Sequence, residues 1–305
     1  MNAIKISVVI CTYNRSDLLF KTLTALLNQT VTPFEIIVVD NNSTDNTKEI
    51  VQQLINCTNQ NLIYLLEPRQ GATFARNTGG FTAKGDIIAF LDDDVIPKEN
   101  YIENLFQAFN TNNLDYIGGG IELEYLTPKP DWLDDRLAGI LAYCNYGNNI
   151  VEFPCQGKKY PISANIAIKK EVFISVNGFV QNELNYKWSK PCNDDILFGM
   201  RVHKSGYKIT YLPDITIKHL IPKERLTVDY FKSCFYFYGV ADIVHQIIKK
   251  GLLSYLYIIP RSLIRIFIGF VKSSIIKNPK EKHWQLFRIY YNWGLIVGIL
   301  RSITL

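Results

Sequence analysis

The sequence predicts an α/β fold in which a mostly parallel central sheet is covered by helices on both faces. Three observations support this prediction. Short, continuous apolar runs rich in β-branched residues are typical of strands buried on both faces of a parallel sheet. Segments with apolar residues at helical spacing alternate with these runs. Polar residues stand directly after several runs, where open α/β sheets bind their ligands.

In the first 109 residues each predicted strand is followed by a predicted helix. The strands are expected at residues 6–11, 36–39, 62–66 and 87–91, and the helices at residues 16–29, 45–55, 74–83 and 98–109. The stretch from 115 to 192 is less regular, with prolines and glycines that mark loops. It contains possible strands at 121–125 and 163–168, and a helix at 194–204 with an extended segment at 208–212 follows. We expect one domain over residues 1–228, with halves at 1–115 and 116–228.

The charge of the chain is unevenly distributed. The net charge of the whole chain is +5, but residues 218–305 alone carry +10, which leaves −5 for residues 1–217. Such asymmetry within one chain indicates a region that meets a charged partner. We expect residues 229–305 to form a basic, amphipathic, helical tail.

Within this tail, residues 252–271 have the length of a membrane span, about 20 residues. Pro260, Arg261 and Arg265 lie inside the segment, and arginines at mid-span make crossing costly. The tail also contains flanking lysines and aromatic residues, which suit a helix lying in the membrane interface: Lys249, Lys250, Lys272, Lys277, Lys280, Lys282, Trp284, Tyr290, Tyr291 and Trp293. The tail is therefore predicted to contact an anionic membrane surface. The alternative is a helical subdomain that packs on the main domain or on a second subunit.

Composition excludes several classes of protein. With 48% hydrophobic and 20% charged residues, the chain is neither disordered, nor collagen-like, nor a disulfide framework. None of its six cysteines forms a C-x-x-C pair, so a zinc site is not expected and reduced thiols are. The first residues lack the pattern of a secretory signal, so we expect a cytoplasmic protein, peripherally associated with the inner face of the cell membrane. Nucleic-acid binding is not expected, because the tail's basic residues accompany aliphatic stripes.

Acidic residues follow two predicted strands directly. Asp40 comes after the run 36–39, and Asp92, Asp93 and Asp94 come after the run 87–91. Three adjacent carboxylates form a hard-oxygen environment that suits Mg²⁺ or Mn²⁺ together with substrate phosphates. A solvated turn is the alternative for such a run.

Four motifs, in order and spacing, resemble a family of known enzymes. They are CTYNR (11–15), VVDNNSTDNT (38–47), GATFARNTGG (71–80) and FLDDDVIP (90–97). Together they resemble a family 2 glycosyltransferase with the GT-A fold, a Rossmann-like nucleotide-diphospho-sugar transferase, over about residues 4–225. The resemblance implies that residues 1–115 bind the nucleotide sugar and that residues 116–228 bind the acceptor.

The resemblance assigns the donor side to particular residues. Thr12, Tyr13, Arg15 and Asp40 match positions that hold the nucleobase and ribose, and a carboxylate suits the N–H of uracil. Arg76 matches an arginine near the nucleotide, and a guanidinium can pair with phosphate oxygens in a fork. For Asp40 the alternative role is a turn or helix cap, and for Arg76 it is a surface salt bridge.

The same comparison implies a divalent cation. Asp94 matches a direct metal ligand, and Asp92 matches a ribose-side or water-mediated carboxylate that also counts among the metal candidates. Asp93 is expected on the nucleotide side. His219 stands where some family members complete the metal shell, and a structural histidine is the alternative.

Acceptor activation is assigned to the segment that begins at Asn193. Asp195 matches the general base, and Asp194 stands where the family usually has glutamate. Carboxylates at a helix start are stabilised as anions, and simple helix capping is the alternative role for both. Asn165 and Trp188 are acceptor-side candidates, and Trp132 and Trp188 could each stack on a sugar or pack in the core.

The motifs and the family resemblance together predict an inverting, metal-dependent hexosyltransferase. It would move a sugar from a UDP-linked donor to a hydroxyl of a glycan or lipid-linked glycan, in the synthesis of a polysaccharide or cell-surface glycan. The first alternative is a non-catalytic, nucleotide-sugar-binding membrane scaffold of the same fold. A nucleotidyltransferase is disfavoured, because CTYNRSD after the first strand contains no glycine.

Overall fold

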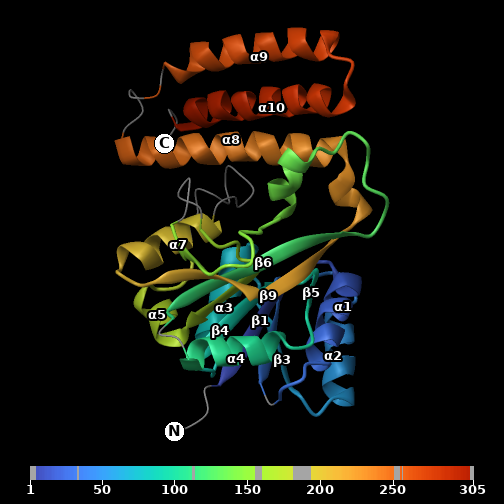
Figure 1. Ribbon diagram of the computed structural model, residues 1–305, viewed down its shortest axis with the longest axis vertical. Helices are drawn as coiled ribbons and strands as arrows, with labels where there is room; N and C mark the ends of the chain where they lie inside the picture. The colour runs from blue at the N-terminus through green and yellow to red at the C-terminus, as the bar shows by residue number, and fades with distance from the viewer. Residues whose placement is uncertain are drawn as a thin grey trace. The chain divides into compact units, whose positions relative to one another are not determined.

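The computed structural model describes residues 5–32, 34–111, 114–154, 160–180, 194–250, 255 and 257–302 (Figure 1). The chain forms two compact units. The first takes in the described residues of Met1–Glu124, Ala142–Gln181 and Asp194–Leu220. The second combines Tyr125–Leu141 with Ile221–Leu305, so one short internal segment groups with the C-terminal helices.

The first unit is built on a mixed sheet with the strand order β3-β2-β1-β4-β8-β6-β9-β5, and β7 pairs with β9. The strands β3, β2, β1 and β4 pair in parallel, as predicted. The strand β8 pairs antiparallel with β4 and β6, and β5 and β7 pair antiparallel with β9. The bounds are β1 Ile6–Thr12, β2 Glu35–Asp40, β3 Asn61–Leu66, β4 Ile87–Asp92, β5 Val95–Pro97, β6 Tyr116–Tyr125, β7 Val151–Phe153, β8 Asn165–Lys169 and β9 Ile209–Ile221.

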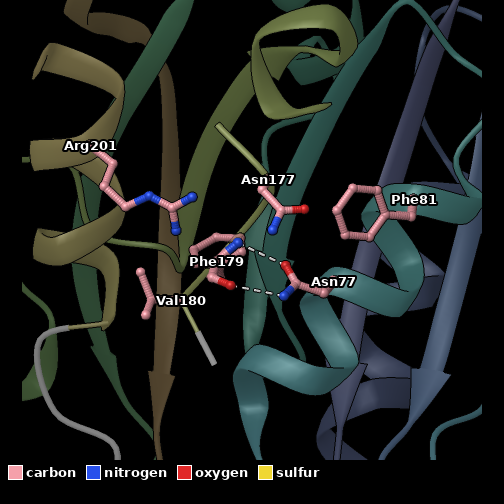
Figure 2. Close-up of a pocket in the computed structure, with 6 residues that line it drawn as sticks. All are labelled: Asn77, Phe81, Asn177, Phe179, Val180 and Arg201. Atoms are coloured by element: carbon pink, nitrogen blue, oxygen red, sulfur yellow. Dashed lines mark hydrogen bonds between the residues drawn. The ribbon is translucent and has the colours of Figure 1, made fainter. Parts of the chain in front are cut away.

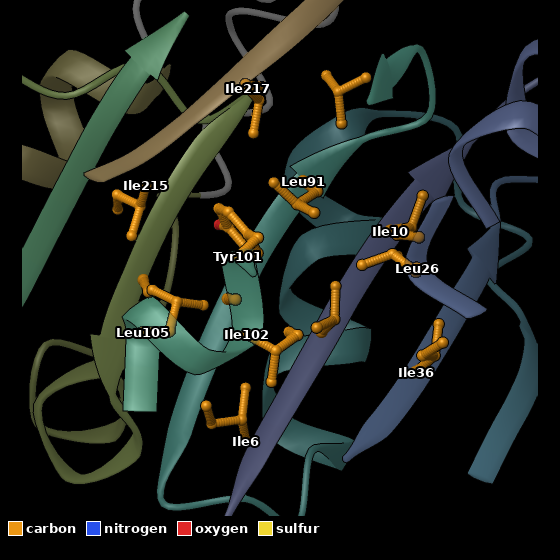
Figure 3. Packing of buried hydrophobic residues seen from close by; sticks show 14 of the residues in the cluster. Ile6, Ile10, Leu26, Ile36, Leu91, Tyr101, Ile102, Leu105, Ile215 and Ile217 are labelled. Atoms are coloured by element: carbon orange, nitrogen blue, oxygen red, sulfur yellow. The ribbon is translucent and has the colours of Figure 1, made fainter. Parts of the chain in front are cut away.

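Helices cover both faces of this sheet. Alternate residues of β1 point to opposite faces, because side chains alternate along a strand. Val8 and Ile10 join a core cluster with α1 (Ser16–Leu27), α2 (Thr47–Cys57) and α4 (Tyr101–Thr111), part of which is drawn in Figure 3. Val9 joins the opposite cluster with α3 (Ala72–Thr82), α5 (Lys170–Ser175) and α7 (Asp194–Lys204). The predicted helix at 194–204 is confirmed, whereas α5, with only six residues, is too short to show a helical stripe.

The second unit is mainly helical. It contains short 3-10 helices at Asp135–Leu141 and Lys223–Leu226, and the long helices α8 (Val228–Lys250), α9 (Ile258–Ile275) and α10 (Pro279–Ser302). The helix α10 packs against both α8 and α9 and lies between them in Figure 1. Trp132 packs on Phe231 and Phe287 within this unit, so the core-packing alternative for this tryptophan is confirmed.

The helices of the tail differ from the predicted 20-residue segment. The helix α9 begins at Ile258, so the predicted segment 252–271 starts before it and is not one continuous helix in the described part of the chain. Among the described residues, no helix combines the length and the apolar character that a membrane crossing requires.

Candidate functional site

The carboxyl ends of β1, β2 and β4 bring polar residues to one edge of the sheet. Thr12, Asp40 and Asp92 are the last residues of these three strands. The register places Thr12 beside Asp40, and Cys11 beside Asp92. The predicted meeting of these strand ends is therefore found in the structure.

Arg15 gathers two of the three adjacent aspartates. Its Nη1 donates to Asp93 Oδ1 at 3.0 Å and to Asp94 Oδ2 at 2.9 Å, and Thr12 Oγ1 donates to Asp93 Oδ2 at 2.8 Å. Both carboxylates are buried. Burial and the neighbouring charge of Asp94 raise the pKa of Asp93 to about 6, and the Arg15 guanidinium opposes this shift. Asp93 and Asp94 are therefore buried and paired with Arg15, so this part of the run is not a solvated turn.

His219 reaches the same cluster from β9. The pairing of β5 with β9 sets His219 opposite Val95, and the backbone N–H of Leu220 donates to the carbonyl of Asp94 at 2.8 Å. As a result His219 Nε2 lies 3.0 Å from Asp94 Oδ1, and both side chains are excluded from solvent. The antiparallel pairing of β5 with β9 thus brings together Asp94 and His219, which are more than 120 residues apart in the sequence.

Arg76 and Asp92 form a second ion pair at the edge of the sheet. Arg76 Nη2 lies 3.2 Å from Asp92 Oδ1, and the guanidinium stacks over the ring of Phe179 at 5.6 Å. Arg76 is mostly buried, so it is not a surface salt bridge on an exposed helix. Burial alone would lower the pKa of Arg76, but the nearby carboxylates, Asp92 foremost, raise it.

Asp40 is held by groups of its own domain. Its Oδ1 accepts the backbone N–H of Ser43 at 2.8 Å, and its Oδ2 accepts the hydroxyl of Tyr64 at 2.8 Å. The capping alternative for Asp40 is therefore found, and it leaves each oxygen a second lone pair for another donor. Tyr13, by contrast, is 48% exposed beyond the end of β1 and presents an open aromatic face.

The loops after β1 and β2 are tied to each other. Asn14 adopts a positive φ of 52°, which its short amide side chain tolerates. Its backbone N–H donates to Ser43 Oγ at 2.9 Å, and its Oδ1 accepts the backbone N–H of Thr44 at 2.7 Å. These bonds fix the two loops that carry Tyr13 and Asp40.

A third loop at this edge is absent from the sequence prediction. Glu67 follows β3, is buried, and accepts Arg69 Nε at 2.8 Å and Arg69 Nη2 at 2.7 Å. The Arg69 hydrogen bond, with a second one from Thr78, holds the pKa of Glu67 at about 2. Asn41 binds this loop through the carbonyls of residues 67 and 69 and the N–H of Gly71. The signal was present, because Glu67 stands after a strand just as Asp40 does.

Asp195 lies in the first turn of α7, as predicted. Its Oδ1 accepts the N–H of Ile196 at 2.8 Å, and its Oδ2 accepts the N–H of Ser163 at 3.4 Å. Burial raises the pKa of Asp195 above the ordinary value of 3.8, and the charge of Arg76 opposes the shift. Arg76 interacts electrostatically with Asp92, Asp194 and Asp195, which links the acids of α7 to those after β4.

The prediction that Asn165 faces an acceptor gives way to a structural role. Asn165 is fully buried, and its Oδ1 accepts the hydroxyl of Tyr101 at 2.9 Å. Its Nδ2 donates to the carbonyls of Gly120 at 3.0 Å and Ile215 at 2.7 Å, so both amide hydrogens are used inside the sheet. A Cβ at Gly119 would lie 2.2 Å from Asn165 Nδ2, which explains a glycine there. Trp188 lies outside the described residues.

A cavity of about 390 Å³ lies on the α3 and α7 side of the first unit (Figure 2). Asn77 and Phe179 exchange two hydrogen bonds, of 2.9 Å from Asn77 Nδ2 and 2.7 Å to Asn77 Oδ1, as the dashed lines show. Arg201, six residues after Asp195, lines the cavity together with Asn177 and Phe81. Burial lowers the pKa of Arg201. The lining thus offers amide and guanidinium groups next to apolar rings.

The residues present can be tested against a divalent cation. Within the described ranges, no group of three or more His, Cys, Asp and Glu side chains is arranged to hold a metal ion by itself. Asp94 and His219 still offer a carboxylate oxygen and an imidazole nitrogen 3.0 Å apart. This pair fits Mn²⁺ or Mg²⁺ when the remaining ligands come from a diphosphate, the common arrangement for such ions.

Comparison of the sequence with known families gives a consistent result. The profile of "Glycosyl transferase family 2" matches residues 7–176. "Glycosyltransferase AglE" of Haloferax volcanii is 27% identical over 212 residues, which cover 69% of this chain and 65% of the relative. "Glucosyl-dolichyl phosphate glucuronosyltransferase" of the same organism is 22% identical over 320 residues, which cover 97% of this chain and 96% of the relative.

Solved structures share the fold. A mannosyltransferase from Pyrobaculum calidifontis, in complex with GDP-Man and Mn²⁺, superposes with a TM-score of 0.63 and 16% identity. The match covers 98% of this chain and 88% of that one. Residues 1–349 of Staphylococcus aureus TarS superpose with a TM-score of 0.54 and 15% identity, covering 98% and 92% of the two chains.

Proposed function

Because this chain belongs to glycosyl transferase family 2 and has the GT-A fold, we propose that it is an inverting hexosyltransferase. It moves a sugar from a UDP-linked donor to a hydroxyl group of a lipid-linked glycan. The observation that carries the proposal is the cluster of Arg15, Asp93, Asp94 and His219 beside the Arg76–Asp92 pair at the ends of the parallel strands. This cluster combines cations and carboxylates in the way that a bound diphosphate and its counter-ion require.

The donor would bind along the ends of β1, β2 and β4. Tyr13 supplies an exposed ring for the nucleobase, and Asp40 keeps lone pairs for a base N–H. Asp92, partly exposed, can accept a ribose hydroxyl. Arg76 supplies positive charge beside the diphosphate. Arg15 would exchange one of its carboxylate contacts for a phosphate oxygen.

Asp94 and His219 would hold the divalent cation. When bound there, Mn²⁺ or Mg²⁺ supplies Lewis-acid charge that stabilises the leaving diphosphate. A neighbour of the same fold is a complex with GDP-Man and Mn²⁺, which supports this part of the proposal.

Asp195 is proposed as the general base. It takes the proton of the acceptor hydroxyl while that oxygen bonds to the anomeric carbon of the donor sugar. The bond from the anomeric carbon to the diphosphate breaks on the opposite face, so the configuration inverts. The hydrogen bonds from Ile196 and Ser163 fix the carboxylate during this step.

The acceptor class comes from the relatives. One is named "Glucosyl-dolichyl phosphate glucuronosyltransferase". Another, from Campylobacter jejuni, is named "GalNAc(5)-diNAcBac-PP-undecaprenol beta-1,3-glucosyltransferase" and is 32% identical over 152 residues, 44% of this chain and 49% of that protein. Both names describe polyprenyl-linked substrates. With a charge of +10 on residues 218–305, we place the protein at the inner face of the cell membrane, against anionic lipid.

Donor binding and turnover test the proposal separately. The purified chain is titrated calorimetrically with UDP-, GDP- and dTDP-sugars with and without Mn²⁺, and release of the nucleoside diphosphate is followed. Wild type should bind one donor only with metal. Asp94→Ala should lose this binding, while Asp195→Asn should bind normally and turn over about 10²–10⁴-fold more slowly. Asp17→Asn, an exposed acid in the first turn of α1, is the matched control and should behave as wild type.

Two results would contradict the proposal. If no nucleotide sugar binds under any condition, the enzyme assignment fails. If wild type binds a donor with metal but Asp195→Asn and wild type release diphosphate equally slowly in the presence of polyprenyl-linked acceptors, the non-catalytic scaffold is favoured.

A further inference from the structure

The helix α9 buries small residues and exposes large apolar ones, which is the opposite of a surface helix in a water-soluble protein. Its buried residues are the small Ser262 and Gly269. Most of its large apolar residues point to solvent, with Phe267 70% and Ile275 74% exposed, whereas Ile258 and Ile259 in the first turn pack partly against a buried cluster. The exposed set, named the α9 face below, consists of Leu263, Ile264, Phe267, Ile268, Phe270, Val271 and Ile275.

Small residues let α9 approach its neighbour closely. A Cβ added at Gly269 would lie 2.7 Å from Ile289 Cγ1 of α10, so the contact surface has no room for a side chain there. Helices that pack in lipid use this arrangement, with small residues inward and large ones toward the acyl chains. In water, a helix normally buries its large apolar residues instead. The packing of α9 therefore suits an apolar medium on its outer side.

The charges of α9 form a stripe beside the α9 face. Arg261, Arg265 and Lys272 are exposed, and at about 100° per residue they fall within about 40° of one another around the helix axis. They lie between the α9 face and the side packed on α10, where basic side chains can extend to headgroups. The helix itself contains no acidic residue. Just beyond it, Glu281 pairs with Arg136 at 2.6 Å.

We propose that the α9 face docks in the plane of an anionic lipid bilayer, with its apolar side chains at the headgroup–acyl boundary and Arg261, Arg265 and Lys272 on lipid phosphates. The functional role of this docking rests on the proposed lipid-linked acceptor, because a chain bound to the bilayer encounters acceptors that diffuse in the same membrane plane. The docking itself does not depend on that acceptor. It deepens that proposal by naming one helix as the docking element. A second copy of the chain is a poorer occupant, because joining two such faces brings the basic stripes together without an acidic partner.

Flotation with vesicles tests the docking without any turnover. The full chain is mixed with phosphatidylcholine vesicles containing either none or 30% phosphatidylglycerol, and the bound fraction is measured after centrifugation through a density gradient. Wild type should float with the anionic vesicles. Leu263→Gln/Phe267→Gln/Phe270→Gln should bind at least about 100-fold more weakly, because three apolar side chains no longer enter the bilayer. Arg261→Gln/Arg265→Gln/Lys272→Gln should lose about 100-fold of the preference for anionic lipid.

Phe20→Gln is the matched control, since Phe20 is an equally apolar, 46% exposed residue on α1. It should float as wild type does. Circular dichroism and nucleotide binding check that every variant is folded and keeps its donor site. Failure of wild type to float, or floating that survives the apolar triple substitution, overturns the inference. A dimer in solution that becomes a monomer on that substitution also overturns it. Each of these results leaves donor binding and turnover, and hence the proposed sugar transfer, unaffected, whereas failure of wild type to float would also contradict the proposed place of the protein against anionic lipid.

Discussion

Two regions of the molecule depart from the usual distribution of polar and apolar groups, in opposite directions. The acidic rim of the first unit buries ionisable side chains: Asp93, Asp94 and His219 are almost fully excluded from solvent. The α9 face of the second unit exposes large apolar side chains. Both arrangements cost free energy in water if nothing binds. The comparison teaches that the two proposals call for partners of opposite kinds, a charged ligand at the rim and an apolar surface at α9.

The strongest test of the rim removes its internal cation. In Arg15→Met the carboxylates of Asp93 and Asp94 lose the guanidinium that lies 3.0 Å and 2.9 Å from them. Breaking a buried pair in this way should lower the free energy of unfolding by about 3 kcal/mol or more. If the rim is built for a cation, millimolar Mn²⁺ should restore most of the lost stability, because only the folded state binds it. Thermal melts with and without Mn²⁺ measure both effects.

Lys208→Met is the control for this measurement. Lys208 pairs with Glu152 while both side chains are largely exposed, so its loss should change stability by less than about 1 kcal/mol. Mn²⁺ should not alter its melt. A variant of Arg15 that is equally unstable with and without Mn²⁺ would show that the carboxylates of Asp93 and Asp94 do not bind a metal ion in place of the guanidinium.

The close packing around Gly119 of β6 predicts a smaller loss in the free energy of unfolding. Gly119→Ala places a Cβ 2.2 Å from Asn165 Nδ2 and 2.4 Å from the carbonyl of Ile215, both fixed by hydrogen bonds. Overpacking of this kind costs about 1–3 kcal/mol. Gly139→Ala, where no atom lies within 4 Å, should be nearly neutral. Equal denaturant midpoints for the two variants would show that the three-glycine segment of β6 is not held this closely.

On α9 we expect substitution of a small buried residue to destabilise the protein more than substitution of a large exposed apolar residue. Gly269→Val drives a side chain into Ile289 and should destabilise the chain by about 1–3 kcal/mol. Phe267→Gln removes a large apolar side chain that is mostly in water, and the free energy of unfolding should change by less than about 0.5 kcal/mol. Urea unfolding without lipid compares them. A larger loss from Phe267→Gln would mean that the α9 face packs against protein in solution.

The sequence predicts most of the strands and helices of the first unit because its parallel strands have a clear local sequence pattern. The runs ending at Cys11, Val39 and Leu91 are apolar, β-branched and bounded by polar residues, so local chemistry alone locates them. The same logic locates Asp40 and Asp92, whereas Asp195 is located by the family resemblance. It also misleads at Asn165, whose neighbours in sequence suggest a site whereas its partners, Tyr101 and two backbone carbonyls, come from distant strands. A fully bonded buried amide is a property of the tertiary structure.

The remaining differences have similar physical reasons. The antiparallel pairing of β8 depends on a return of the chain without a crossover helix, which no residue type records. The Glu67 loop follows a strand with partly exposed residues, so the sequence pattern there does not predict a buried acid at the edge of the sheet. On α9 the sequence gives an amphipathic pattern, but it does not say which face meets α10. Only the approach of Gly269 to Ile289 decides this.

The finest test concerns the pH dependence of turnover and the charges around Asp195. A general base must be ionised, so kcat should fall as the pH decreases through the pKa of Asp195. Burial raises this pKa, so the fall should occur at higher pH than for a free aspartate. Arg76 lowers the pKa of Asp195 and Asp92 raises it.

At saturating donor, Arg76→Gln should therefore move the acidic limb of kcat upward in pH, and Asp92→Asn should move it downward. Arg76→Lys keeps the charge and should leave the limb near its wild-type position. Shifts of the same sign in both neutral variants would show that a group other than Asp195 sets the limb, because only opposite charges near one carboxylate move its titration in opposite directions.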